Sequence, residues 1–178
     1  MSKEFENFVR ITANRVGSQA TIDAARETKT WQDKLEELYR TVEQSLSPFI
    51  KDGTIAFSTE TVQLQEELLG RYEAKAARIV LGNRTARLKP VATFIIGARG
   101  RVDLVGPRGI VRIVLVPANA TGYATRKGAS EKNAQPDPPV KDWSWKFTTP
   151  PPRITYVDVD QDSFQNALME VMGATHGE

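Results

Sequence analysis

The chain has 178 residues, of which 40% are hydrophobic and 26% charged, and these are the proportions of an ordinary globular domain rather than of a disordered segment. It contains no cysteine and one histidine, His176, in the C-terminal tail. The lack of cysteine excludes disulfides, thiolate metal sites and cysteine nucleophiles. A single tail histidine leaves little scope for histidine-based acid–base chemistry.

The net charge of +2 hides three unlike segments. Residues 1–70 carry 8 basic and 12 acidic side chains, residues 71–132 carry 13 and 3, and residues 133–178 carry 3 and 7, so the segment charges are −4, +10 and −4. This segregation indicates either an acidic partner for the middle segment or neutralisation of that segment by its two flanks.

The N-terminal sequence is acidic and amphipathic, unlike a secretory signal, which is basic and then apolar. The longest apolar run begins at Ile113 and is far too short to span a bilayer. We therefore expect a cytoplasmic protein that does not engage a membrane.

The first fifty residues have the apolar spacing of helices. Steps of three and four residues connect two stripes, Phe5, Phe8, Val9, Ala13, Val16 and Ala20, and then Trp31, Leu35, Leu38, Val42, Leu46 and Phe49. The apolar face is weaker between them, where Thr30 and Asp33 have the spacing of an N-cap and its capping-box partner. A helical hairpin and one long helix both satisfy this pattern, and we prefer the hairpin. Gly53 ends this helical arm or hairpin, residues 1–52, which we expect to form one continuous domain with the rest.

From Thr54 onward the pattern changes to alternating, β-branched residues separated by short turns. Gly82-Asn83 suits a type II′ hairpin turn, and Pro107-Arg108 suits the turn of a second hairpin. The second hairpin places Val105 opposite Ile110 and Asp103 opposite Arg112, so that the lone aspartate of a basic stretch becomes a cross-strand partner. Turns this short leave no room for helical crossovers and predict an antiparallel meander of about six to eight strands over residues 53–178.

The C-terminal third contains a loop, an aromatic strand and a helix. Residues 118–142 lack periodicity and are predicted to form a flexible loop. Trp143, Trp145 and Phe147 then alternate on a strand and are expected in the core, and prolines 150–152 force a corner. A final helix carries one apolar side, with Asp160 or Asp162 as its cap and Gly173 as its end: Phe164, Ala167, Leu168, Val171 and Met172.

The predicted fold class is therefore α+β. An N-terminal helical hairpin, or a long helix, precedes an antiparallel β-meander sheet, and a C-terminal helix closes one face of that sheet.

The glycine-rich stretch GARGRVDLVGPRG, residues 97–109, lacks the context of a phosphate loop. Strands follow its glycines where a helix is needed, and no Lys-Ser or Lys-Thr pair is present. Asp158, Asp160 and Asp162 alternate as in an EF-hand loop, but Ser163 and Met169 occupy the positions that need glycine and glutamate. We expect helix capping there, and we predict no catalytic residue, no cofactor and no metal site.

Two functions remain open. The leading hypothesis is a non-catalytic protein that binds another protein, as an accessory, adaptor or immunity-type inhibitor, because charge segregation and a helical arm are present without a catalytic arrangement. The alternative is nucleic-acid binding through a basic sheet face. The interaction candidates are Arg84, Arg87, Lys89, Arg99, Arg101, Arg108 and Arg112. If the sheet cannot cover both predicted helices, we expect self-association through Trp31, Leu35, Leu38 and Val42.

Overall fold

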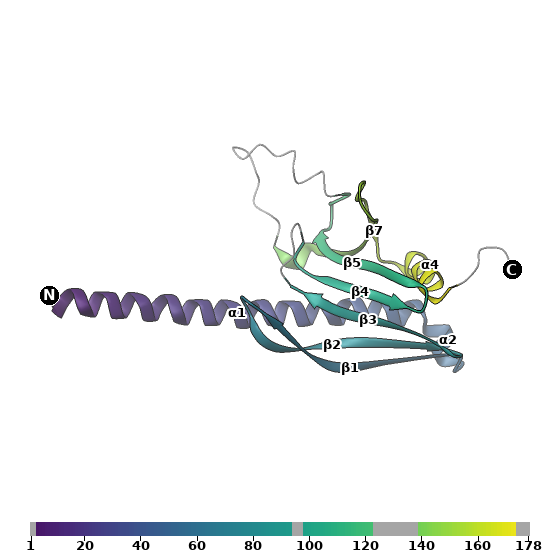
Figure 1. Ribbon diagram of the computed structural model, residues 1–178, viewed down its shortest axis with the longest axis horizontal. Helices are drawn as coiled ribbons and strands as arrows, with labels where there is room; N and C mark the ends of the chain where they lie inside the picture. The colour runs from purple at the N-terminus through teal and green to yellow at the C-terminus, as the bar shows by residue number, and fades with distance from the viewer. Residues whose placement is uncertain (1–2, 94–97, 123–138, 174–178) are drawn as a thin grey trace.

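The computed structural model describes residues 3–93, 98–122 and 139–173, apart from the side chains of Lys3, residues 11–22 and Val140. The α+β class is confirmed: a long N-terminal helix precedes a seven-stranded antiparallel sheet, and a C-terminal helix packs on that sheet (Figure 1). The strands lie in the order β1 to β7, so the sheet is the meander that the short turns predict.

Helix α1 (Lys3–Ser45) is one continuous helix, so the preferred hairpin is wrong and the long-helix alternative is correct. The segment between the two apolar stripes contains no proline, and its alanine, arginine and glutamate residues favour helix. Gly17 costs only about 1 kcal/mol inside a helix, which is too little to end it.

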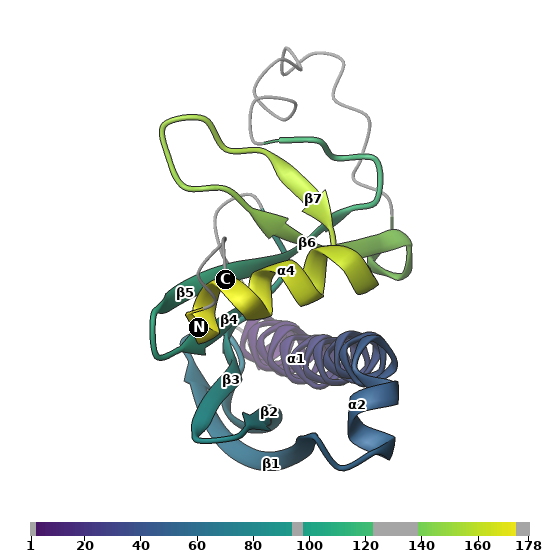
Figure 2. The same cartoon turned by 90° about the vertical axis from the view of Figure 1, so that its right-hand side faces the viewer.

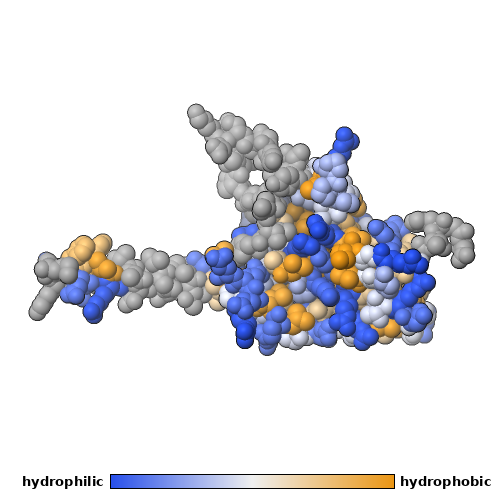
Figure 3. All heavy atoms as spheres, in the orientation of Figure 1, coloured by the Kyte–Doolittle hydropathy of each residue, from blue (hydrophilic) through white to orange (hydrophobic). Residues whose placement is uncertain are grey.

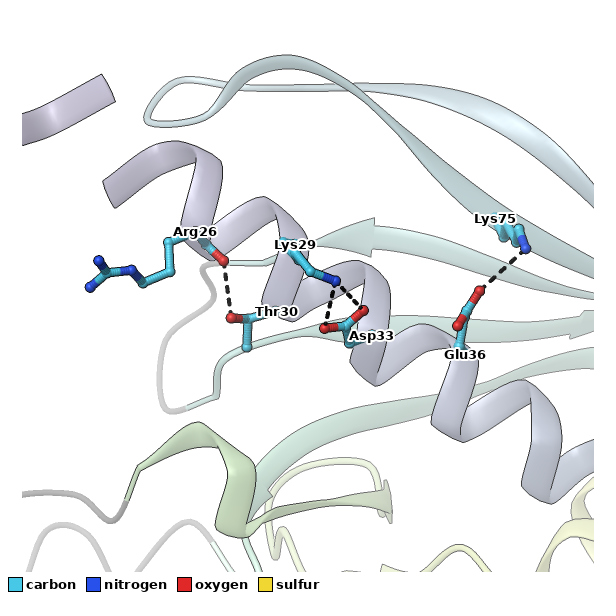
Figure 4. Close-up of polar contacts among 6 residues, drawn as sticks. All are labelled: Arg26, Lys29, Thr30, Asp33, Glu36 and Lys75. Atoms are coloured by element: carbon cyan, nitrogen blue, oxygen red, sulfur yellow. Dashed lines mark hydrogen bonds and ion pairs between the residues drawn. The ribbon is translucent and has the colours of Figure 1, made fainter. Parts of the chain in front are cut away.

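Thr30 and Asp33, predicted to begin a helix, lie inside α1 (Figure 4). The Thr30 hydroxyl donates to the carbonyl oxygen of Arg26 at 3.0 Å, and Lys29 donates to both Asp33 carboxylate oxygens at 3.1 and 3.2 Å. Threonine hydroxyls inside helices readily bond back to the preceding turn. Cap-like spacing therefore did not distinguish a helix start from a helix interior.

A short helix, α2 (Ser47–Lys51), turns the chain from α1 into the sheet. Pro48 lies in its first turn, where a missing N–H costs no helical hydrogen bond. Gly53 follows with a φ of 81°, a left-handed conformation that glycine adopts without strain, and the helical section ends there as predicted.

The seven strands are joined by turns of the predicted kind. They are β1 (Ile55–Glu66), β2 (Gly70–Leu81), β3 (Arg84–Ala92), β4 (Arg101–Gly106), β5 (Gly109–Pro117), β6 (Trp143–Thr148) and β7 (Tyr156–Asp158). Between β2 and β3, Gly82 has a φ of 59° and Asn83 has no positive φ, as a type II′ turn requires. Between β4 and β5 the predicted register is confirmed, with Val105 opposite Ile110.

The sheet curves around α1, which Figure 2 shows nearly end-on. Both α1 and the C-terminal helix pack on its concave face, where alternate strand residues such as Leu88, Leu104 and Ile113 are fully buried. The three aromatic residues of β6 are buried as predicted, and the Trp145 ring lies 5.8 Å from that of Trp31 on α1. The apolar side of the C-terminal half of α1 is thus covered by the protein's own sheet.

Helix α4 (Gln161–Met172) begins and ends where the sequence predicts. The Asp160 carboxylate accepts a hydrogen bond from the Ser163 N–H at 2.8 Å, and the Ser163 hydroxyl accepts one from the Asp160 N–H at 2.9 Å. Gly173 ends the helix with a φ of 87°. The five residues predicted for its apolar side are all buried.

Two glycines of the GARGRVDLVGPRG stretch lie where other elements approach closely. A Cβ atom on Gly100 would lie 2.3 Å from Cζ3 of Trp31, and one on Gly106 would lie 2.3 Å from the carbonyl oxygen of Val171 on α4. Gly106 also forms the last pair before the turn, opposite Gly109. Close packing against α1 and α4 therefore adds a reason for glycine that the turn pattern alone does not reveal.

Three sequence predictions fall mainly outside the described residues. They are most of the apolar stretch ATFIIG, residues 92–97, which the alternating pattern includes among the strands, most of the loop over 118–142, and the tail that contains His176. The described ends of that loop are residues 118–122, where Gly122 pairs with Thr155, and a 3-10 turn, η1 (Val140–Asp142), directly before β6. Among the helices of the described part, none is long and apolar enough to cross a membrane.

Candidate functional site

A cleft of about 640 Å³ lies where β6 separates from β5. We call it the β5 cleft; its walls are the start of β5, the exposed side of α4, and the turn between β6 and β7. Representative lining residues are Ile110, Arg112, Phe147, Pro150, Ala167 and Glu170. Its volume lies within the range of about 300–1,000 Å³ that is usual for ligand clefts.

One wall of the β5 cleft contains an ion pair between Arg101 and Asp103. The guanidinium donates to both carboxylate oxygens at 2.8 Å, and these bonds raise the pKa of Arg101 above its usual value. The register does place Asp103 opposite Arg112, as predicted, but the ion pair that we expected between them goes to Arg101 instead. Arg101 lies two residues away on the same face of β4, and its planar fork matches both oxygens.

Four of the seven basic interaction candidates are engaged within the chain. Arg84 donates to the carbonyl oxygen of Met172 at 2.9 Å, where the negative end of the α4 dipole lies. Arg87 pairs with Glu60 and Arg99 with Glu27, each at 3.5 Å, and Arg101 binds Asp103 as described. Acidic residues outside the middle segment, Glu27 and Glu60, therefore supply part of the neutralisation that the charge segregation suggested.

The other three candidates, Lys89, Arg108 and Arg112, have exposed side chains. Arg108 lies at the β4–β5 turn, where its N–H donates to the carbonyl oxygen of Val171 at 2.9 Å and its side chain passes over Gly173. Arg112 lines the β5 cleft. The register places Lys89, Asp103 and Arg112 side by side on the convex face of the sheet, with Arg87 and Arg101 two residues along on the same face. Arg84 and Arg108 lie beside turns and Arg99 precedes β4, so the seven candidates do not all share one site.

The residues predicted for self-association are covered by the chain itself. Trp31, Leu35, Leu38 and Val42 are each at most 2% exposed, because the curved sheet and α4 enclose the C-terminal half of α1. The condition on which we expected self-association through these residues, a sheet too small to cover them, is therefore not met.

The N-terminal half of α1 runs beyond the sheet (Figures 1 and 3). We call residues 3–26 the helical arm; at about 1.5 Å per residue they span roughly 36 Å. Directly after the arm, Glu27 pairs with Arg99 of the body, and Trp31 is buried. Near the tip, Phe5, Phe8 and Val9 are 59%, 63% and 47% exposed.

Two buried lysines are structural residues that the sequence did not single out. Lys34 Nζ donates to the carbonyl oxygen of Trp143 at 2.9 Å and pairs with Glu37 at 3.0 Å. Lys146 Nζ donates to the carbonyl oxygens of Ala118 and Ala120 at 2.7 and 3.0 Å. A lysine in an amphipathic helix, like Lys34, or in an alternating strand, like Lys146, resembles a solvent-facing residue, so no local signal identifies either one as buried.

A polar cluster also fixes the β1–β2 turn to the end of β3. Glu66 accepts bonds from the Thr93 N–H at 2.9 Å and from the Thr93 hydroxyl at 2.6 Å, and it accepts a further bond from the Tyr72 hydroxyl. Burial, followed by the bond to Glu66, raises the pKa of Tyr72. The cluster holds the curled hairpin in place.

The alternating aspartates of the β7–α4 junction have separate partners. Asp158 pairs with Lys146 at 3.2 Å, and Asp160 caps α4. The backbone N–H of Ser163 donates to the Asp160 carboxylate and lowers its pKa. Within the described ranges, no group of three or more acidic or histidine side chains is placed to hold a metal ion.

Comparison with known proteins adds no relative to this description: no family model, no curated protein and no solved structure matches the chain.

Proposed function

We propose that this protein works by binding another protein, as a non-catalytic accessory, adaptor or immunity-type inhibitor. The observation that carries the proposal is the helical arm, which leaves the body while Phe5, Phe8 and Val9 near its tip remain exposed. The arm is the surface that we assign to this partner.

The described apolar side chains near the tip of the arm lack the packing that normally stabilises a helix. Most helical stability in proteins comes from packing an apolar face, and an isolated helix is marginal in water. In the C-terminal half of α1 that packing is supplied by the sheet, whereas Phe5, Phe8 and Val9 have large exposed areas. A partner that covers these side chains would remove their apolar surface from water, and this burial would favour binding.

The helical spacing favours an extended contact along the arm. At 3.6 residues per turn, Ala24 and Val9 lie about 20° and about 40° around the helix axis from Trp31, so they share the side of α1 that is docked further along, and Phe5, at about 80°, lies at its margin. A partner helix laid along this side would extend the packing that the body begins. We therefore favour a helical segment as the partner's contribution.

Nucleic-acid binding receives less support from the described contacts. Four of the seven basic candidates already bind carboxylates or helix carbonyls, and a phosphate would have to compete with those partners. Salt-sensitive binding to duplex or single-stranded oligonucleotides, weakened by removing Arg108 and Arg112, would favour this alternative over ours.

The test compares the arm with an equally exposed apolar residue elsewhere. Light scattering on size-exclusion fractions reports self-association, and capture from a lysate of the source cells reports a second protein. The double variant Phe5→Ser/Phe8→Ser should lose the captured protein or the self-association. The control Leu68→Ser, at a 72% exposed position of the β1–β2 turn, should retain it.

Two results would lead us to abandon the proposal. One is a wild-type chain that stays monomeric at high concentration and captures nothing. The other is a complex that survives the double arm variant unchanged, because then the arm does not contribute the contact.

A further inference from the structure

The first residues of β5 have an open backbone edge on the side of β6. Leu115 accepts a hydrogen bond from the Arg99 N–H and donates one to the Gly100 carbonyl oxygen, both at 2.9 Å on the β4 side. Backbone groups alternate sides along an antiparallel strand. Odd-numbered residues of β5 therefore point toward β4, and even-numbered residues, including Ile110, point toward β6.

Strand β6 ends before it can pair with Ile110. The β5–β6 register begins with Arg112 opposite Thr148, so two further residues along would place Pro150 opposite Ile110. Proline has no N–H to donate, and it cannot continue a strand that must bond on that side. The chain instead turns toward β7, where the Thr149 N–H donates to the Thr155 carbonyl oxygen at 3.1 Å.

The sequence predicts a corner at prolines 150–152. Because the chain turns there, the N–H and the carbonyl oxygen of Ile110 both face the β5 cleft. The hydrogen bonds formed outside the regular strands include none with Ile110 among the described residues. An unpaired strand edge beside a cleft is a template for a further strand.

The side chains around this edge specify different chemistry on its two faces. On the convex face, Ile110 is 61% exposed, and Arg112, two residues along, is also exposed and lies opposite Asp103, whose carboxylate is held by Arg101. On the concave face, the cleft is lined by Val111, Phe147 and Ala167. Glu170 of α4 also lines the cleft and disfavours an acidic side chain near it.

We propose that the β5 cleft binds an extended segment of a partner protein, which adds to β5 as a short antiparallel strand opposite Ile110. The segment alternates acidic and apolar side chains: the acidic ones lie on the convex face near Arg112, and the apolar ones point toward Phe147 and Ala167. This site is separate from the helical arm, so it stands or falls independently of the arm's role.

The strand geometry predicts which backbone amides of the segment matter. Residues opposite each other in a sheet share a face, so the residue paired with Ile110 is one of the acidic ones. Its N–H donates to the Ile110 carbonyl oxygen, and its carbonyl oxygen accepts from the Ile110 N–H. The N–H groups of the apolar residues point away from β5.

The probe is a capped pentapeptide, acetyl-Glu-Val-Glu-Val-Glu-amide, titrated into the full chain with detection by amide chemical shifts. Binding should shift the Ile110 amide and slow its hydrogen exchange. Methylating the glutamate backbone nitrogens should weaken binding about tenfold or more, because it removes the donor to Ile110. Methylating the valine nitrogens should change the affinity much less.

Protein variants test the charge preference. Arg112→Glu should weaken binding of the glutamate peptide about tenfold or more and should favour the corresponding lysine peptide. The matched control is Arg78→Glu, at an exposed position that the register places on the same face three strands away; it should bind like the wild type.

Three outcomes would overturn the inference. They are no binding of the glutamate peptide at about 1 mM, the weakest affinity we would accept as specific, equal effects of the two methylation patterns, and shifts that cluster away from Ile110. Charge-dependent binding that ignores methylation would indicate simple attraction to Arg112 rather than strand addition.

Discussion

Replacing Gly106 by alanine tests whether α4 is fixed to the β4–β5 hairpin by close backbone packing. The added Cβ would lie 2.3 Å from the Val171 carbonyl oxygen and 2.7 Å from its carbonyl carbon, where ordinary contacts are 3.4–4 Å. The obstacle is helix backbone, which cannot rotate away as a side chain can. The same carbonyl oxygen accepts the Arg108 N–H at 2.9 Å, so moving α4 stretches a hydrogen bond as well.

We expect Gly106→Ala to lower the free energy of unfolding by about 1–3 kcal/mol, the usual cost of forcing one extra carbon into a packed interior. For a chain of this size, each kcal/mol of lost stability lowers Tm by roughly 2–4 °C. Urea unfolding followed by circular dichroism and by tryptophan fluorescence measures the change. Both probes should report one transition, because α4 and the tryptophans belong to the same core.

Gly109→Ala is the matched control, because Gly109 pairs with Gly106 across the turn. A Cβ there meets nothing within 4 Å, and the φ of Gly109 is not in the left-handed region. It should be neutral or stabilising by up to about 1 kcal/mol, since alanine restricts the unfolded chain. Equal stability of the two variants would refute the packing argument for Gly106.

Three further predictions concern buried and capping groups. Lys146→Met should cost about 1.5–3 kcal/mol in urea unfolding because it leaves the Ala118 and Ala120 carbonyl oxygens without their charged donor, whereas the exposed Lys141→Met should be neutral. Asp160→Ala should cost about 0.5–2 kcal/mol at pH 7. Because the cap lowers the pKa of Asp160, the difference in the free energy of unfolding between the wild type and this variant is full above about pH 4 and should disappear as the pH falls through the lowered pKa. A variant that stays equally destabilised down to about pH 2 would contradict the role of the charged cap. Burial raises the pKa values of Tyr39 and Tyr72. The stabilisation of the folded state by these two neutral phenols is therefore full below about pH 10 and is lost as the pH rises further. Spectrophotometric titration should therefore find that these two phenols ionise only with unfolding, and normal ionisation of all tyrosines in the native state would contradict their burial.

Local patterns in the sequence determined the element types and much of the register. Alternation and two-residue turns predicted the meander, and Pro107-Arg108 was sufficient to align Val105 with Ile110, because a turn of fixed length sets the pairing of both strands. The capping residues and apolar side of α4 were likewise visible, since each depends on neighbours within a few residues.

Local patterns were ambiguous where two different structures produce the same spacing of residues. Thr30 and Asp33 have cap spacing yet lie inside α1, and the weak apolar face near them is compatible with a hairpin as well as with one helix. The choice depends on what covers the helix, which is information from distant strands. For the same reason, Trp31 and Val42 looked available for a second copy although the sheet encloses them.

The sequence by itself thus determined the strands, the turns and the C-terminal helix, because these arise from periodicity and from the conformational limits of glycine and proline. Only the tertiary structure decided that the N-terminal half of α1 runs beyond the sheet, that Asp103 binds Arg101 in preference to Arg112, and that Pro150 leaves the edge of β5 open. Each of these depends on which distant segments meet, and the curvature of the sheet brings them together.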